Sequence, residues 1–190
     1  MNNSILILVF CFLLEVVLQL IWIVTDYRSL KEKIKWSLKL QTLLFSFVNL
    51  ITGILLIITI IYLPLPRTFL DPILVVIGLT VVVLGFIIAS WAKLTMRKSW
   101  APAEQPTIPG QENKLIISGP FRFSRNPIYL GIILLALGTC IALRSYLIFV
   151  VIIPILKFYK AAIREETILE NKFGERYLEH KNRVPRFLIR

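Results

Sequence analysis

The hydrophobic residues of this chain form long runs that few polar residues interrupt. Three of these runs, Ser4–Val24, Thr42–Leu63 and Pro72–Trp91, have the length that a helix needs to cross a bilayer, which is about 20 residues. Each run is bounded by polar or proline-containing segments. The pattern therefore predicts three membrane-spanning helices in the first half of the chain.

A fourth apolar region, Ile128–Lys160, is interrupted at Leu143-Arg144-Ser145. It is too long for one span and slightly short for two. We expect a tight hairpin of two helices, Ile128–Leu143 and Tyr146–Lys160, with local bilayer thinning or flanking basic residues absorbing the mismatch. The predicted fold class is an all-α integral membrane protein with five transmembrane helices, followed by a cytoplasmic C-terminal helix.

The composition and the placement of charge agree with this interpretation. The chain is 57% hydrophobic with a mean hydropathy of +0.77, which excludes an ordinary soluble domain. Its net charge of +11 would suggest nucleic-acid binding in a soluble protein. Here every Lys and Arg except Arg67 and Arg144 falls on one side of the predicted topology. This is the positive-inside pattern, so we expect an external N-terminus, a cytoplasmic C-terminus and contacts with membrane lipids, but not with nucleic acid.

The chain offers little that could bind a metal. His180 is its only histidine, and Cys11 and Cys140 both lie inside apolar runs. Buried free cysteines in such runs usually act as small hydrophobic side chains. We therefore predict no metal site and no disulfide.

A polar, proline-rich stretch from Lys93 to Ser118 divides the chain in two. Residues 1–92 contain the three N-terminal transmembrane helices. Residues 93–190 contain this cytoplasmic loop, the hairpin and the C-terminal helix. Loops of this length in small proteins are usually functional or disordered, and we interpret this one as a wall or lid of a ligand site.

The segment Gly119–Gly131 joins the loop to the hairpin and is the richest in candidate chemistry. Asn126 is expected to cap the helix that Pro127 begins. Arg122 and Arg125 flank this helix N-terminus, which is itself a favourable place for an anion. Because capping requires neither the arginines nor the nearby aromatic residues, we hypothesise a ligand site. The aromatic residues are Phe121, Phe123 and Tyr129.

The acidic pair Glu165-Glu166 lies one hairpin later in the sequence. Such a pair is often only solvated surface. An antiparallel hairpin, however, would return residue 165 to the level of residues 120–129. Two acids would then face two arginines and an aromatic cluster, which suits a ligand that carries both signs of charge.

Several short motifs occur in a characteristic order from about Asn113 to the C-terminus. They are Asn113–Gly119, the Arg-x-Pro-x-Tyr form at Arg125–Tyr129, Glu165-Glu166, Phe173–Tyr177 and Arg183–Phe187. In this order and spacing the chain resembles the family of isoprenylcysteine carboxyl methyltransferases and phospholipid methyltransferases. The resemblance implies an integral-membrane methyltransferase that uses S-adenosyl-L-methionine at the cytoplasmic face and methylates a lipophilic acceptor. The acceptor would be a prenylcysteine-like carboxylate or a lipid amine.

The resemblance also assigns residues. The implied cofactor contacts are Asn113, Lys114, Leu115, Ile116, Phe121, Asn126, Pro127, Ile128, Tyr129 and Glu165. The candidate catalytic residues are Arg125, Glu165 and Glu166, and the candidate substrate-binding residues are Lys160 and Arg164.

Two positions depart from the family pattern. Asn126 stands where many members have histidine, and it cannot titrate near neutral pH. Ala161 stands where the isoprenylcysteine branch has an arginine, four residues before the first glutamate. A carboxylate acceptor is already nucleophilic at neutral pH, whereas an amine must first lose a proton to Glu166 or to water. The sequence therefore predicts the cofactor better than the acceptor.

Two other functions fit parts of the pattern. Membrane reductases with a related C-terminal half use NADPH, and Arg122 and Arg125 could hold its 2′-phosphate. A non-catalytic lipid-binding membrane protein could retain the fold with an altered pocket, to which Asn126 would be a clue.

Overall fold

The computed structural model describes residues 2–27, 51, 53–54, 57–58, 66, 68–96 and 115–188. Most of the predicted span Thr42–Leu63 and the loop residues 97–114 therefore lie outside the described residues. Within the described ranges the chain is all-α. The α-helices are α1 (Asn2–Tyr27), α3 (Asp71–Met96), α4 (Pro127–Ala142), α5 (Ile152–Phe173) and α6 (Glu175–Arg183), with short 3-10 helices η2 (Gly119–Arg122) and η3 (Tyr146–Phe149).

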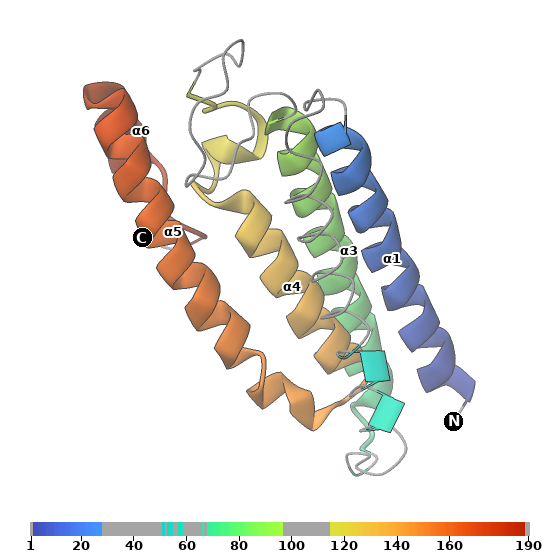
Figure 1. Ribbon diagram of the computed structural model, residues 1–190. Coiled ribbons are helices and arrows are strands. Elements are labelled where there is room, and N and C mark those ends of the chain that lie inside the picture. The colour runs from blue at the N-terminus through green and yellow to red at the C-terminus, as the bar shows by residue number, and fades with distance from the viewer. Residues whose placement is uncertain are drawn as a thin grey trace.

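Helices α1, α3 and α4 stand side by side (Figure 1). Helix α5 starts at the end of this bundle where α4 ends, and it leans away from α4 as it rises. Helix α6 then folds back along α5. Small and aliphatic side chains make the shared core, with the outer faces of the helices left apolar. The buried core residues are Cys11, Leu18, Val82, Ala89 and Leu135.

Glycines allow α3 and α4 to pack with their backbones almost in contact. A Cβ atom added to Gly85 would lie 2.7 Å from both the Gly131 carbonyl oxygen and the Leu135 amide nitrogen. A Cβ atom on Gly138 would lie 2.6 Å from the Val82 amide nitrogen. In a lipid environment the hydrophobic effect does not drive helices together, so their association depends on close packing. Small residues at the interface allow that close packing. The α3–α4 pair is consequently the most closely packed pair of helices in the described part of the chain.

The observed helices match the predicted spans in type and approximate position. The stretches Ser4–Thr25, Asp71–Met96 and Tyr146–Phe173 have the length and hydropathy to cross a membrane. The helix Pro127–Ala142 is apolar but shorter. Its 16 residues extend about 24 Å at 1.5 Å per residue, less than the roughly 30 Å of a bilayer core.

The second arm of the hairpin differs in detail from the prediction. It opens with the 3-10 turn η3, and the α-helix begins at Ile152 instead of Tyr146. Pro154 therefore lies in the first turn, where its missing N–H leaves no intrahelical bond unmade, and it does not need to kink the helix. The helix then continues past Lys160 to Phe173, beyond the predicted end of the hairpin, before Gly174 turns the chain with a φ of 55°.

An ion pair closes the far end of the bundle. Arg144, in the turn after α4, contacts the carboxylate of Asp71 at the start of α3 and the carbonyl of Pro66. The Arg144 backbone has a φ of 51°, which is uncommon for a residue with a side chain. The contact therefore accounts for the arginine at this turn and anchors the base of the hairpin to α3.

Arg144→Gln is expected to lower the free energy of unfolding by about 1 kcal/mol, because this ion pair is only partly exposed. Asp71→Asn should have a similar effect, and the double variant should lose less than the sum. A double-mutant cycle on thermal unfolding in detergent measures the coupling. Strictly additive losses would show that the two side chains do not interact.

Candidate active site at the start of helix α4

Asn126 occupies the N-cap position of α4, but its side chain makes no capping hydrogen bond. Instead its Nδ2 donates to Glu166 Oε1 at 3.2 Å and to the Arg186 carbonyl oxygen at 3.4 Å. The expected side-chain cap is therefore wrong. Asn126 connects the start of α4 to α5 and to the C-terminal segment.

Glu166 is the centre of a buried polar cluster. Its residue surface is only 3% exposed. Arg186 donates to it from Nε at 2.8 Å and from Nη2 at 3.1 Å, while Arg125 Nη1 lies 3.2 Å from Glu166 Oε2 as an ion pair. Among the described residues, Arg125 Nη1 and Nε nevertheless have no hydrogen-bond acceptor. We call Arg125, Asn126, Glu166 and Arg186 the Glu166 cluster.

The C-terminal segment Val184–Phe187 lies against the chain just before α4. The Arg125 amide donates to the Pro185 carbonyl at 2.9 Å, and the Asn126 amide donates to the Arg186 carbonyl at 3.2 Å. Ser124 Oγ also donates to the Arg186 carbonyl at 3.1 Å. The segment is thus held through its backbone as well as through the Arg186 side chain.

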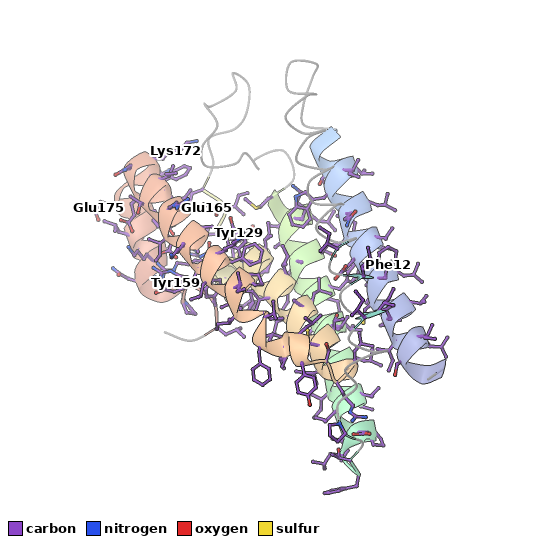
Figure 2. All side chains as sticks on the ribbon, turned by 60° about the horizontal axis from the view of Figure 1, so that its bottom comes forward. Phe12, Tyr129, Tyr159, Glu165, Lys172 and Glu175 are labelled. Atoms are coloured by element: carbon purple, nitrogen blue, oxygen red, sulfur yellow. The ribbon has the colours of Figure 1, made fainter. Side chains whose placement is uncertain are left out.

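Glu165 faces a different direction from its neighbour. Its carboxylate accepts a hydrogen bond from the Tyr129 hydroxyl, and Figure 2 shows these two side chains pointing toward each other from α5 and α4. The Tyr129 ring stacks on Phe158 with centroids 5.1 Å apart and planes 22° apart. The hairpin has therefore returned Glu165 to the level of Tyr129, as predicted. A carboxylate beside stacked aromatic rings favours a cationic ligand group.

The remaining predicted residues are distributed as follows. Phe121 and Pro127 are buried, while Leu115, Ile116 and Ile128 are half-buried. Asn113 and Lys114 lie outside the described residues.

Lys160 and Arg164 are exposed. They lie about 120° and 160° around α5 from Glu166, so the helix does not bring them into the Glu166 cluster. Arg122, expected to face the acids, is also exposed. The second arginine at Glu166 is Arg186, for which the sequence pattern indicated no separate role. The only signal was its place in the motif Arg183–Phe187.

Two residues of α6 are packed near the cluster. Tyr177 is 2% exposed, and burial raises the pKa of its hydroxyl, with the charge of Glu166 adding to the rise. Burial also lowers the pKa of His180 below its usual value of 6.5, and the positive charge of Arg125 lowers it further. Both residues are therefore neutral in the folded protein at neutral pH.

This shift makes stability depend on pH in a defined direction. Because the pKa of His180 is lower when folded, the unfolded chain binds more protons between that pKa and about 6.5. Stability should fall as the pH drops through this window. We expect His180→Gln to remove that part of the slope. Thermal unfolding of both proteins between pH 5 and pH 7.5 measures the difference, and parallel curves would contradict it.

Known proteins are similar to the part of the chain that contains the start of α4 and helix α5. The family described as phospholipid methyltransferase matches residues 73–176, which is more than half of the sequence. The chain belongs to that family. The match starts in α3 and continues through α4 and α5 into α6, so it contains Tyr129, Glu165 and Glu166 but ends before Arg186.

Three similar proteins share one description. The chain is 34% identical over 111 residues to protein-S-isoprenylcysteine O-methyltransferase of Saccharomyces cerevisiae, covering 57% of this chain and 46% of the relative. It is 32% identical to protein-S-isoprenylcysteine O-methyltransferase B of Arabidopsis thaliana, covering 57% and 55%. It is also 32% identical to the Xenopus laevis enzyme, covering 58% and 38%. The matched region is thus between about two fifths and about half of each relative.

Proposed function

We propose that this protein is a membrane methyltransferase that uses S-adenosyl-L-methionine and methylates a lipophilic acceptor at the cytoplasmic face. Membership of the phospholipid methyltransferase family and the names of the similar proteins support this activity. The observation that carries the proposal is the facing pair of Glu165 and Tyr129, backed by Phe158.

The residues at this pair suit the chemistry of S-adenosyl-L-methionine. The methyl donor carries a cationic sulfonium, an ammonium and a carboxylate, and it supplies a methyl group that an acceptor takes by direct displacement. The Glu165 carboxylate compensates positive charge, and the Tyr129 and Phe158 rings offer π-faces to it. The start of α4 offers backbone N–H groups to an anion.

The protein's own part in the reaction is to bind, orient and exclude water. Tyr129 keeps the Glu165 carboxylate in one orientation through its hydroxyl. Phe121 of η2 and Pro127, the first residue of α4, are buried and would help to keep water from the start of the helix. Alignment of donor and acceptor in such a dry site is the main source of acceleration for a displacement reaction. We propose Leu115, Ile116, Asn126 and Ile128 as further contacts at this wall.

Glu166 is poorly placed to accept a proton from an amine. Arg186 and Asn126 already donate to its two oxygens, and protonation would break these bonds. Asn126 cannot titrate, which leaves Glu165 as the acidic group at the ligand pair. These facts favour a carboxylate as the acceptor, because it needs no base. Arg125, whose buried Nε and Nη1 have no hydrogen-bond acceptor within the described part of the chain, adds positive charge for such a group.

A labelled-methyl transfer assay on membranes containing the protein tests this function. We expect label from S-adenosyl-L-methionine to enter the lipid extract in a base-labile ester fraction. Label in the phospholipid fraction would instead indicate an amine acceptor, the second candidate that the family description supports. No transfer to either fraction above that of empty membranes would contradict the proposal.

For the topology we propose five crossings with an external N-terminus and a cytoplasmic active site. The distribution of basic residues supports this orientation, and Arg144 with its partner Asp71 would then lie at the external end. Cysteines introduced at Phe123 and at Arg144 should react with an impermeant reagent from opposite sides of sealed vesicles. Labelling of both from the same side would overturn the orientation.

We also propose a division of labour within the chain, with residues 1–92 anchoring and residues 93–190 binding cofactor and acceptor. Because α3 and α4 share a core across this boundary, the division is one of function and not of independent folding.

A further inference from the structure

The position of Glu165 depends on how α5 is held against the start of α4. Helix α5 leans away from α4 (Figure 1) and is joined to it by the turn at the far end. Near the active site, the contacts among the described residues include those of Glu165 with Tyr129 and of Glu166 with Arg125 and Asn126. Any further contact that holds this part of α5 therefore also helps to set the position of Glu165.

The C-terminal segment supplies such a contact. The Arg186 backbone carbonyl accepts from Ser124 and Asn126, which fixes the segment to the chain before α4. From this fixed point the Arg186 guanidinium reaches Glu166 on α5 with two hydrogen bonds, at 2.8 and 3.1 Å. The same guanidinium lies over the Tyr159 ring of α5, with Cζ 5.0 Å from the ring centroid. Arg186 thus links the chain just before α4 to helix α5.

We propose that Arg186 is a positioning residue, which holds α5 through Glu166 and so sets the distance and orientation between Glu165 and Tyr129. Its effect on cofactor binding rests on the proposed function, whereas its effect on geometry does not. Glu166 in this account is an anchor next to the ligand-binding residue Glu165.

The proposal requires an arginine and not merely a positive charge. A guanidinium binds both carboxylate oxygens in a fixed plane and stacks on an aromatic ring, whereas an ammonium is a point charge on a flexible stem. Removing the side chain leaves Glu166 with Arg125 and Asn126, so its buried charge remains compensated. It also leaves the backbone bonds of residue 186 intact. The variants are therefore expected to fold.

Two measurements on the full chain test the inference. The first is titration of S-adenosylhomocysteine into the purified protein, as wild type, Arg186→Gln, Arg186→Lys and the control Arg183→Gln. Arg183 is exposed at the end of α6 and belongs to the same basic motif. The second is a distance distribution between spin labels on exposed Phe123→Cys and Thr167→Cys, with Cys11 and Cys140 replaced by alanine.

We expect both Arg186 variants to bind S-adenosylhomocysteine at least about tenfold more weakly, which is about 1.4 kcal/mol, and to show a broadened distance distribution. Arg183→Gln should match the wild type in both measurements. If the wild type does not bind the ligand but Arg186→Gln still broadens the distances, the proposed function fails and the positioning role stands.

Two results would overturn the positioning role. They are an unchanged distance distribution in both variants and loss of folding in both variants. Unchanged distances together with weakened binding would mean that Arg186 acts on the ligand directly. Loss of folding would mean that it is needed for the fold itself.

Discussion

Glu165→Gln is expected to weaken binding of S-adenosyl-L-methionine by about 10- to 100-fold, the effect of losing a hydrogen-bonded charge worth about 1.5–3 kcal/mol. Glutamine keeps the shape of the side chain and can still accept from the Tyr129 hydroxyl, so the α4–α5 contact should survive. The loss should be smaller for S-adenosylhomocysteine, because its sulfur carries no charge. Calorimetric titration with both ligands measures the two affinities.

Glu170→Gln is the matched control for this experiment. Glu170 lies on the same helix, but its carboxylate contacts Lys181 of α6. Its replacement should leave both affinities within about twofold, since it removes only a partly exposed ion pair. If Glu165→Gln bound each ligand with the same affinity as the wild type, Glu165 would not be part of the cofactor site.

Gly85→Ala is expected to lower the free energy of unfolding by about 1–3 kcal/mol, and Gly85→Leu to prevent α3 and α4 from packing. The new Cβ atom would lie 2.7 Å from two backbone atoms, which cannot move aside as a flexible side chain could. The variants would therefore force apart the pair that positions the start of α4. Thermal unfolding and size-exclusion chromatography in detergent measure the effect.

The neighbouring change Leu84→Ala serves as the control. Leu84 is 49% exposed on α3, so its replacement does not alter the close backbone contact between α3 and α4. It should unfold close to the wild type. A monodisperse Gly85→Leu protein with the wild-type unfolding temperature would show that the close approach of α3 and α4 is not required.

The described helices could be predicted because they follow from the length and apolar content of the runs in the sequence. The same holds for the level to which the hairpin returns the chain. Counting residues through the hairpin was enough to place Glu165 beside Tyr129. The glycine packing was missed, although its signal is present: Gly78 and Gly85, and likewise Gly131 and Gly138, are seven residues apart and so share one helix face. Paired small residues at this spacing indicate a close helix contact.

The division of roles within the acidic pair could not be predicted. Adjacent residues on a helix point about 100° apart, so Glu165 and Glu166 must meet different partners. Which one faces inward depends on what packs against α5. That partner is Arg186, 20 residues later and beyond the turn at Gly174, and the pattern of α5 alone contains no information about it.

Calorimetric titration of the purified wild-type protein with S-adenosylhomocysteine and, separately, with NADPH tests the central claim most directly. The two ligands distinguish a methyltransferase site from the site of a membrane reductase with a related C-terminal half. We expect saturable binding of S-adenosylhomocysteine at one site per chain and no heat of binding with NADPH. Binding of NADPH without binding of S-adenosylhomocysteine would contradict the account.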